Sequence, residues 1–392
     1  MLSSLREKPI YKLMIWMVFA GCLILFIGQF MQAATAPRWI NYDDFVEYWA
    51  AGRLNITGGD PYDPAQLLPL EQSAGRYEGV PVIMWNPPWT LALIMPFSLL
   101  GYVFSRAAWF ILNFIVVLWC ASLSWSLYGG SLKTRWIGWL AAFSFAPVLL
   151  ALKTGQSGAL FYLAVVGFLY FSRKEKDWLA GVFLSLLAIK PHVLYLFGLA
   201  ALIWSIDRRR WRIPLAGGAA VILATAIAWA VNPQVVGQYL FALTNYPPED
   251  WATSTLGGFS RWVLGTEKVW LQFLPAFCGA AWFTFHWWRQ RKAWDWLAQA
   301  PLLILVSFAT MAYGWPSDQI ASLVAIFQIV ILILLSPKGL FAYLIIGIYV
   351  LIDAYLLAFE GNVFWLWWLA AALLIFYLAA RWLVQHRTVA GL

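Results

Sequence analysis

The chain has 392 residues, of which 62% are hydrophobic and only 11% are charged, and its mean hydropathy is +0.72. A soluble domain usually carries about 25% charged residues, so the composition excludes a soluble enzyme and predicts an all-α polytopic membrane protein. The net charge of +8 does not indicate nucleic-acid binding, because the basic residues form short clusters between hydrophobic runs, as cytoplasmic loops do. We therefore expect membrane lipids, and no nucleic acid, among its partners.

No motif for a cofactor is present. The three cysteines, Cys22, Cys120 and Cys278, all lie inside hydrophobic runs without the spacing of metal ligands. There is also no zinc, nucleotide-phosphate or nucleophile-elbow motif. We expect neither a metal nor another cofactor, and no disulfide.

The hydrophobic runs predict a single integral-membrane domain over residues 1–392. The first run, Leu13–Met31, follows Arg6, Lys8 and Lys12 and lacks a convincing cleavage site, so we interpret it as a retained span. The positive-inside rule then gives about 12 crossings (11–13), with both termini in the cytoplasm. The later runs are Ala107–Leu127, Trp136–Leu152, Ala159–Phe171, Trp178–Ile189, His192–Ile206, Pro214–Val231, Leu271–Trp288, Leu297–Tyr313, Ile320–Leu335, Leu340–Leu357 and Phe364–Leu383.

One run does not fit this count. Pro88–Leu100 is shorter than the roughly 20 residues that a spanning helix needs. Either it dips into the membrane from the outside, or it spans and a short run near Gly155 does not. Asp353, inside a predicted span, would also need a partner, and the sequence identifies none.

Two long segments, 32–87 and 232–269, are predicted to be extracytoplasmic loops. The first contains more acidic residues than basic ones, which is not typical of a cytoplasmic loop. Asp63-Pro64 has the pattern of an N-cap followed by a first-turn proline, so a short helix should begin there.

An earlier part of this loop, Asn41–Gly52, predicts an amphipathic helix at the membrane surface. Phe45, Tyr48, Trp49 and Gly52 recur with helical spacing and form one apolar face. Asp44 would then hold a carboxylate at the lipid–water boundary, where we predict that it acts as a catalytic base. The alternative is that Asp43 and Asp44 only cap the helix.

In this topology, polar residues that are distant in sequence meet at the outer face. Lys190 interrupts an apolar run, where a charge costs about 2.5–3.5 kcal/mol at the centre of a spanning helix. It either snorkels to the interface or holds a lipid-linked phosphate. We place Lys153, Gln156 and His192 with Lys190 near the phosphate, and the residues predicted to bind sugar or acceptor are Asp43, Glu47, Tyr48, Asn86, Trp315, Asp318 and Gln319. Some of these assignments have an alternative. Gln156 could simply lie in a tight turn, Asp318 and Gln319 could be the first residues of a helix, and His192 could make only local hydrogen bonds.

This set of groups fits transfer from a lipid phosphate. A phosphate leaving group needs charge neutralisation and not a proton, so one carboxylate acting as base on the incoming hydroxyl is sufficient. Two other hypotheses are a flippase or transporter of a lipid-linked sugar, and a non-catalytic subunit of an envelope-assembly complex. A transporter should carry ionisable groups along a path through the membrane, often with internal repeats, and the sequence shows neither.

The same residues resemble the motif series of glycosyltransferase family 87, from about residue 40 to 320. The motifs are Asp44-Phe45, Tyr48, Ala50-Ala51, Tyr62-Asp63-Pro64, Asn86-Pro87-Pro88, Gly155-Gln156 and Lys190-Pro191. The resemblance implies a GT-C fold in the cell membrane, a polyprenyl-phosphate sugar as donor, and mannose as the sugar.

It also implies an inverting transfer to a lipid or glycan on the extracytoplasmic face, with Asp44 as the catalytic aspartate. Some members of the family carry a histidine in a late outer loop, whereas the corresponding stretch here, Tyr313–Gln319, has none. Asp318 could take a polar role there. The acceptor of phosphatidylinositol mannoside synthesis is therefore not expected to carry over unchanged.

Overall fold

The computed structural model describes residues 43–246, 253–335, 340–358 and 362–390. The predicted first span, Leu13–Met31, and Cys22 lie outside these residues. Within the described ranges the chain forms helices and no strands.

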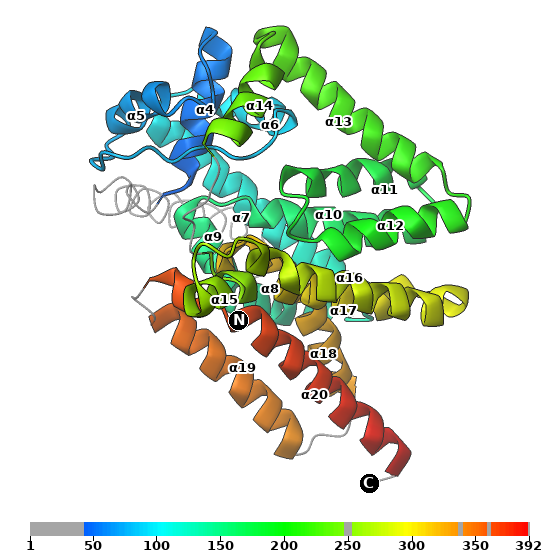
Figure 1. Cartoon of the computed structure of the whole chain (residues 1–392). Coiled ribbons are helices and arrows are strands. Elements are labelled where there is room, and N and C mark those ends of the chain that lie inside the picture. The colour runs from blue at the N-terminus through cyan, green and yellow to red at the C-terminus, as the bar shows by residue number, and fades with distance from the viewer. Residues whose placement is uncertain (1–42, 247–252, 336–339, 359–361, 391–392) are drawn as a thin grey trace, which may run out of the picture.

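Figure 1 shows α4, α5, α6 and α14 gathered at one end of the molecule, with α19 and α20 at the opposite end. The elements are α4 (Phe45–Thr57), α5 (Pro64–Ser73), α6 (Trp89–Ser98), α7 (Tyr102–Leu127), η1 (Leu132–Thr134), α8 (Arg135–Ser144), α9 (Ala146–Thr154), α10 (Gly158–Arg173), α11 (Asp177–Leu184), η2 (Ser185–Ile189), α12 (Tyr195–Asp207), α13 (Arg212–Val231), α14 (Val235–Asn245), α15 (Leu256–Leu264), α16 (Trp270–Gln290), η3 (Arg291–Ala293), α17 (Trp296–Thr310), η4 (Pro316–Ser322), α18 (Leu323–Leu335), α19 (Leu340–Ala358), η5 (Val363–Leu366) and α20 (Leu369–Ala390).

The structure gives fewer full-length spans than the sequence predicts. Among the described residues, four segments are long and apolar enough to cross a membrane: Tyr102–Leu127, Arg212–Val231, Pro316–Ile333 and Val363–Leu383. Several other predicted runs do form helices, but apolar helices of only 10–17 residues. Helices buried among other helices need not each reach both surfaces, because protein groups can satisfy the ends of their backbones. About twelve crossings therefore remains a prediction.

The predicted span Trp136–Leu152 is broken. The chain bends by 60° between α8 and α9, where Phe145 has an extended backbone and Pro147 lies in the first turn of the second helix. Asp353 lies at this bend, and its Oδ1 accepts a hydrogen bond from the Ala146 amide at 3.0 Å. The partner of Asp353, which the sequence did not identify, is thus the N-terminus of α9.

Helix α4 is not the amphipathic surface helix that its spacing predicts. Most of its side chains are buried, including both apolar residues such as Phe45 and polar ones such as Glu47 and Asn55. α5 and α6 pack against it, so the face expected to meet water meets protein instead. The prediction for α5 is confirmed, because Asp63 caps it by accepting a hydrogen bond from the Ala65 amide at 2.9 Å.

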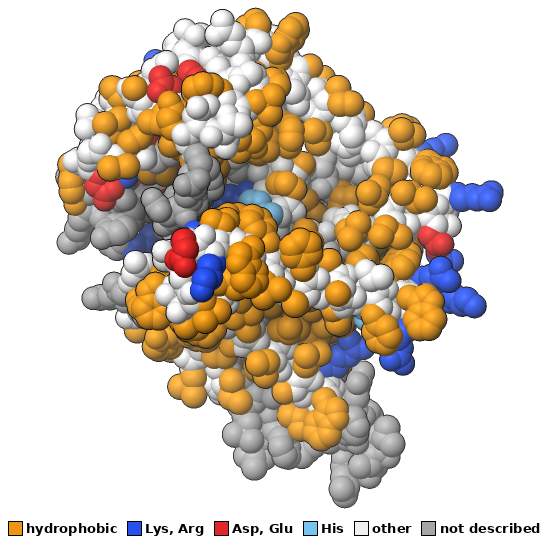
Figure 2. All heavy atoms as spheres, viewed as in Figure 1, with side chains coloured by type: hydrophobic (Ala, Val, Ile, Leu, Met, Phe, Trp, Pro, Cys, Tyr) orange, Lys and Arg blue, Asp and Glu red, His pale blue; other side chains and the backbone are white. Residues whose placement is uncertain are grey.

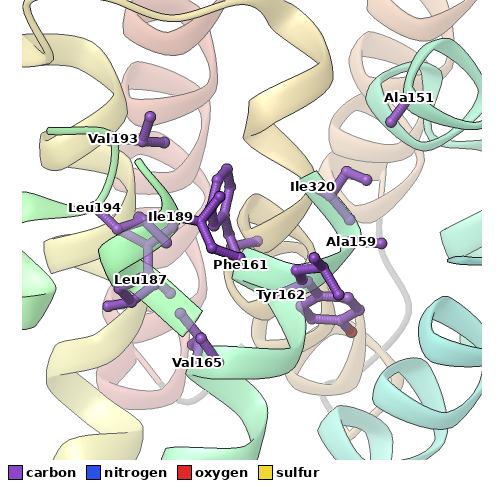
Figure 3. Packing of buried hydrophobic residues seen from close by; sticks show 14 of the residues in the cluster. Ala151, Ala159, Phe161, Tyr162, Val165, Leu187, Ile189, Val193, Leu194 and Ile320 are labelled. Carbon is purple, nitrogen blue, oxygen red and sulfur yellow. The ribbon is translucent and has the colours of Figure 1, made fainter. Parts of the chain in front are cut away.

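Helix α10 lies at the centre of the packing and carries η2 and η4 on its sides. Figure 3 shows Phe161 of α10 beside Ile189 of η2, with Ile320 of η4 nearby. All three side chains are buried. Since Lys190 follows Ile189 and Asp318 lies two residues before Ile320, this apolar contact also sets where those two charges stand.

Basic side chains gather at one edge of the molecule, away from α4 and α5 (Figure 2). Arg208, after α12, donates to the carbonyl of Arg291, after α16, at 2.9 Å, which places two of the predicted cytoplasmic clusters side by side. The grouping agrees with the positive-inside pattern. Which membrane face this edge occupies remains a prediction.

We predict that Gly155→Ala destabilises the fold by at least about 1–2 kcal/mol, the cost of a left-handed backbone for an L-residue. Gly155 has φ +72°, and a Cβ there would lie 2.5 Å from Cβ of Phe45. Thermal unfolding in detergent measures the effect. Gly218→Ala is the control, because no atom lies within 4 Å of its Cβ position. Equal melting temperatures for both variants would contradict the prediction.

Candidate functional site

Asp44 stands at the start of α4, and its carboxylate faces another helix. Its backbone amide donates to the Thr154 carbonyl at 2.8 Å, and its Oδ2 accepts from Nε2 of Gln156 at 2.8 Å. It makes no capping hydrogen bond with its side chain. Asp43 makes the local bond instead, accepting at Oδ1 from the Phe45 amide at 3.0 Å. The capping alternative therefore describes Asp43 and not Asp44.

Gln156 bridges several side chains of the site. Its Oε1 accepts from Oη of Tyr48 at 3.2 Å and from Nζ of Lys190 at 3.0 Å, while its Nε2 donates to Asp44. Two donors on one end and one carboxylate on the other fix the orientation of the amide. The left-handed turn at Gly155 presents Gln156 in this way, directly after α9 ends.

Lys190 points inward. It follows η2, its side chain is only 14% exposed, and its Nζ lies 3.0 Å from Oδ1 of Asp318. Asp318 is fully buried, and its other oxygen accepts from the Trp315 amide at 2.9 Å. The ammonium is thus held by a buried carboxylate and does not snorkel toward a surface, so this interaction offsets part of its desolvation cost.

Burial sets the protonation of the two carboxylates of α4 that face this network. It raises the pKa of Asp44 to about 6, against the lowering effects of the Gln156 hydrogen bond and the Lys190 charge. Burial, with the nearby charge of Asp44, raises the pKa of Glu47 well above its usual range. Near neutral pH, Asp44 is therefore ionised but more basic than an ordinary aspartate, a property suited to accepting a proton.

Asn86 supports the turn that carries Lys190. Its Nδ2 donates to the Ile189 carbonyl at 3.1 Å, and its own carbonyl accepts from Tyr62 at 3.2 Å. Trp89 adds a bond from its indole to the Ala188 carbonyl at 2.9 Å. These contacts place Asn86 beside the site, with its side-chain amide directed at the protein backbone.

Lys153, His192 and Gln319 lie in surroundings that differ from one another. The side chains of Lys153 and His192 are exposed, and the His192 ring lies 6.1 Å from that of Tyr313. Gln319 is fully buried, with no hydrogen-bond partner for either amide atom. Figure 2 shows a histidine and a basic side chain in a hollow between the α4–α6 end and the α15–α16 region. Binding roles for these residues remain predictions.

The sequence analysis missed Arg106 and Tyr102, both on α7. Oδ2 of Asp43 accepts from Oη of Tyr102 at 2.6 Å and from Nε of Arg106 at 2.8 Å. Both oxygens of Asp43 are therefore engaged inside the protein, and its predicted role in sugar binding remains untested. Arg106 could have been identified from the sequence, because it lies near the start of a long apolar run. A charge in such a place usually has a specific partner.

An apolar cavity of about 250 Å³ adjoins the Lys190 turn. Three elements line it, and one lining residue, Ile189, immediately precedes Lys190. The lining residues are Trp89, Thr90, Ala92 and Leu93 of α6, Ser185, Leu186 and Ile189 of η2, and Ala220, Val221 and Ala224 of α13. Within the part of the chain that the structure describes, no three His, Cys, Asp or Glu side chains gather to hold a metal ion.

We predict that Lys190→Met destabilises the protein by about 3 kcal/mol, because it leaves the buried carboxylate of Asp318 without its counter-charge. The double variant Lys190→Met/Asp318→Asn should recover most of this loss. Thermal unfolding measures both. Lys174→Met, at an exposed lysine, is the control and should have little effect. A double variant as unstable as the sum of its single changes would contradict the ion pair.

Comparison with known proteins identifies a family. No match is found among curated proteins or among solved structures. The model of glycosyltransferase family 87 matches residues 85–337, more than half of the chain. The matched range contains Gln156, Lys190 and Asp318 and begins after Asp44. The chain belongs to glycosyltransferase family 87 and is a membrane glycosyltransferase.

Proposed function

We propose that the protein transfers a hexose, with mannose as the expected sugar, from a polyprenyl-phosphate donor to a lipid or glycan acceptor at the extracytoplasmic face. One observation carries this proposal. Asp44 and Lys190, from distant parts of the chain, contact opposite ends of the same Gln156 amide. A base and a cation are thereby held in one site, separated by one side chain.

In the proposed reaction, Asp44 accepts the proton of the acceptor hydroxyl as its oxygen attacks the anomeric carbon. The bond from that carbon to the phosphate oxygen breaks, and the phosphate leaves with the electron pair. Attack from the side opposite the leaving group inverts the anomeric configuration. Lys190 neutralises the charge that develops on the phosphate, so the leaving group needs no proton.

The contacts of Lys190 leave capacity for this role. An ammonium group has three donors, and among the residues that the structure describes Gln156 and Asp318 are its two hydrogen-bond partners. With respect to those residues, the third donor can serve a phosphate oxygen. Since one lysine faces the carboxylates of Asp44 and Asp318, a high pKa at Glu47 has a further use. A protonated Glu47 adds no negative charge and can donate a hydrogen bond to a sugar hydroxyl.

The cavity beside Lys190 provides a place for the hydrocarbon part of the donor. Its walls are mainly apolar, and Ile189 brings one wall next to the proposed phosphate position. One wall belongs to α13, which is long and apolar enough to span a membrane and is only 17% buried. A chain entering from the lipid side along α13 would therefore remain in contact with apolar groups as far as Lys190.

Replacing the base tests the reaction directly. Asp44→Asn should lower transfer from polyprenyl-phosphate mannose by at least about a hundredfold, the lower end of general-base contributions, without changing the melting temperature. In the wild-type protein, kcat/KM should fall as the pH drops below about 6, because the base is then protonated. Quantitative mass spectrometry of the product measures both effects.

Asp63→Asn is the matched control, since asparagine also caps helices well and Asp63 lies outside the site. Near-normal turnover by Asp44→Asn would contradict its role as base. Movement of a labelled lipid-linked sugar across liposomes, without any glycosidic product, would favour transport instead.

Filling the cavity should weaken donor binding. We predict that Ala220→Phe and Ala224→Phe raise the Kd for polyprenyl phosphate at least about tenfold, as expected when about two methylene groups lose their burial. Ala219→Phe and Ala226→Phe are matched controls on the exposed face of the same helix. Binding to protein in nanodiscs measures the effect. Equal affinities for all four variants would show that the hydrocarbon lies elsewhere.

A further inference from the structure

We propose that Arg106 is a positioning residue for the reaction: through Asp43, it holds the base Asp44 and the bridging Gln156 in register with each other. The inference rests on the proposed function, because it assigns Arg106 to the same site. Arg106 itself touches neither Asp44 nor Gln156 in the contacts of the structure.

Arg106 joins the two chain segments that supply the base and the amide. Its Nε donates to Oδ2 of Asp43, next to Asp44, at 2.8 Å. Its Nη2 donates to the carbonyls of Leu152 at 2.8 Å and Lys153 at 2.9 Å, in the last turn of α9. One guanidinium therefore ties the start of α4 to the end of α9.

Further bonds reinforce the same junction. Tyr102, one turn before Arg106 on α7, donates to Asp43, and Trp109 donates from its indole to the Gly155 carbonyl at 2.7 Å. Tyr102, Arg106 and Trp109 recur at i, i+4 and i+7, so they form one stripe of α7. This stripe contacts both residues that flank the Asp44–Gln156 hydrogen bond, Asp43 and Gly155.

The cost of burying the Arg106–Asp43 pair favours a role in positioning the site over a role in general stability. The side chains of Arg106 and Asp43 are only 1% and 2% exposed, so the pair carries a desolvation penalty that its attraction offsets only with good geometry. Apolar residues of similar size could hold the helices together without this penalty. Donating to a carboxylate from one nitrogen and to two carbonyls from another uses the rigid fork of arginine, which lysine lacks.

The ion pair also balances the charge beside the base. The groups facing Asp44 are Asp43 before α4, Glu47 of α4, Gln156 after α9, Lys190 after η2 and Asp318 of η4. The charge of Asp43 raises the pKa of Asp44. Burial raises the pKa of Asp43 itself, and Arg106 opposes that rise. Without Arg106, Asp43 should bind a proton more readily, so loss of either partner should remove the Asp43 charge and lower the pKa of Asp44.

Three variants separate charge from geometry: Arg106→Gln, Asp43→Asn and the double variant. Both single variants should lower the pKa of Asp44 below about 6, because the Asp43 charge is lost in Asp43→Asn and neutralised by a proton in Arg106→Gln. They should differ in kcat, because Asp43→Asn keeps the bonds from Arg106 to the carbonyls of Leu152 and Lys153. In Arg106→Gln and in the double variant, kcat should be about a hundredfold low, as for a base displaced by roughly 1 Å, and in Asp43→Asn it should fall less.

The experiment combines the pH profile of kcat/KM with carboxyl ¹³C NMR of Asp-labelled full-length protein in detergent, in which Asp44→Asn assigns the Asp44 signal. Arg106→Lys should restore the titration but only part of kcat. Arg53→Gln is the control, because the Arg53 side chain donates to the Ser98 carbonyl from further along α4, away from Asp43 and α9.

A kcat that falls equally in Arg106→Gln and Asp43→Asn, or a double variant with normal kcat, would overturn the positioning role. If the wild-type protein transfers no sugar at all, the proposed function fails. The NMR titrations would still decide whether Arg106 controls Asp44.

Discussion

The amide of Gln156 offers an oxygen at one end and a nitrogen at the other, and the arrangement of the site depends on this difference. The oxygen attracts donors, Tyr48 and Lys190, and the nitrogen attracts an acceptor, Asp44. A carboxylate and an ammonium group in direct contact would compensate each other's charge. The amide keeps Asp44 and Lys190 from forming such a contact while holding them close together, and the ion-pair partner of Lys190 is Asp318.

The surrounding helices fix the position of the Gln156 amide. α9 ends at Gly155, whose left-handed backbone turns Gln156 toward α4, and a side chain on Gly155 would collide with Phe45. On the other side, packing of η2 and η4 against α10 fixes Lys190 and Asp318. Short, interrupted helices are well suited to this, because each break delivers polar groups into an otherwise apolar bundle.

Much of this arrangement could be predicted from the sequence, for physical reasons that differ between residues. Lys190 was identifiable because an isolated charge in an apolar run is costly, and Asp63 because a cap followed by proline is a local signal. The burial of α4 could not be predicted, because its apolar spacing is that of a surface helix. Only the folded structure shows that α5 and α6 cover it. The contact of Arg106 with Asp43 bridges 63 residues, and no local pattern encodes such a distance. The number of full-length spans could not be derived from the sequence for a related reason, since hydropathy does not show which apolar helices are covered by protein.

In the proposed mechanism, one site holds the base and the phosphate-binding cation on either side of the reacting sugar. A cryo-EM structure of the full-length protein in nanodiscs with a non-transferable polyprenyl-phosphate sugar analogue would show whether this is so. We expect a phosphate oxygen within hydrogen-bond distance of Nζ of Lys190, with the Asp44 carboxylate on the opposite side of the anomeric carbon. A phosphate bound away from Lys190, or a sugar shielded from Asp44, would disprove this mechanism.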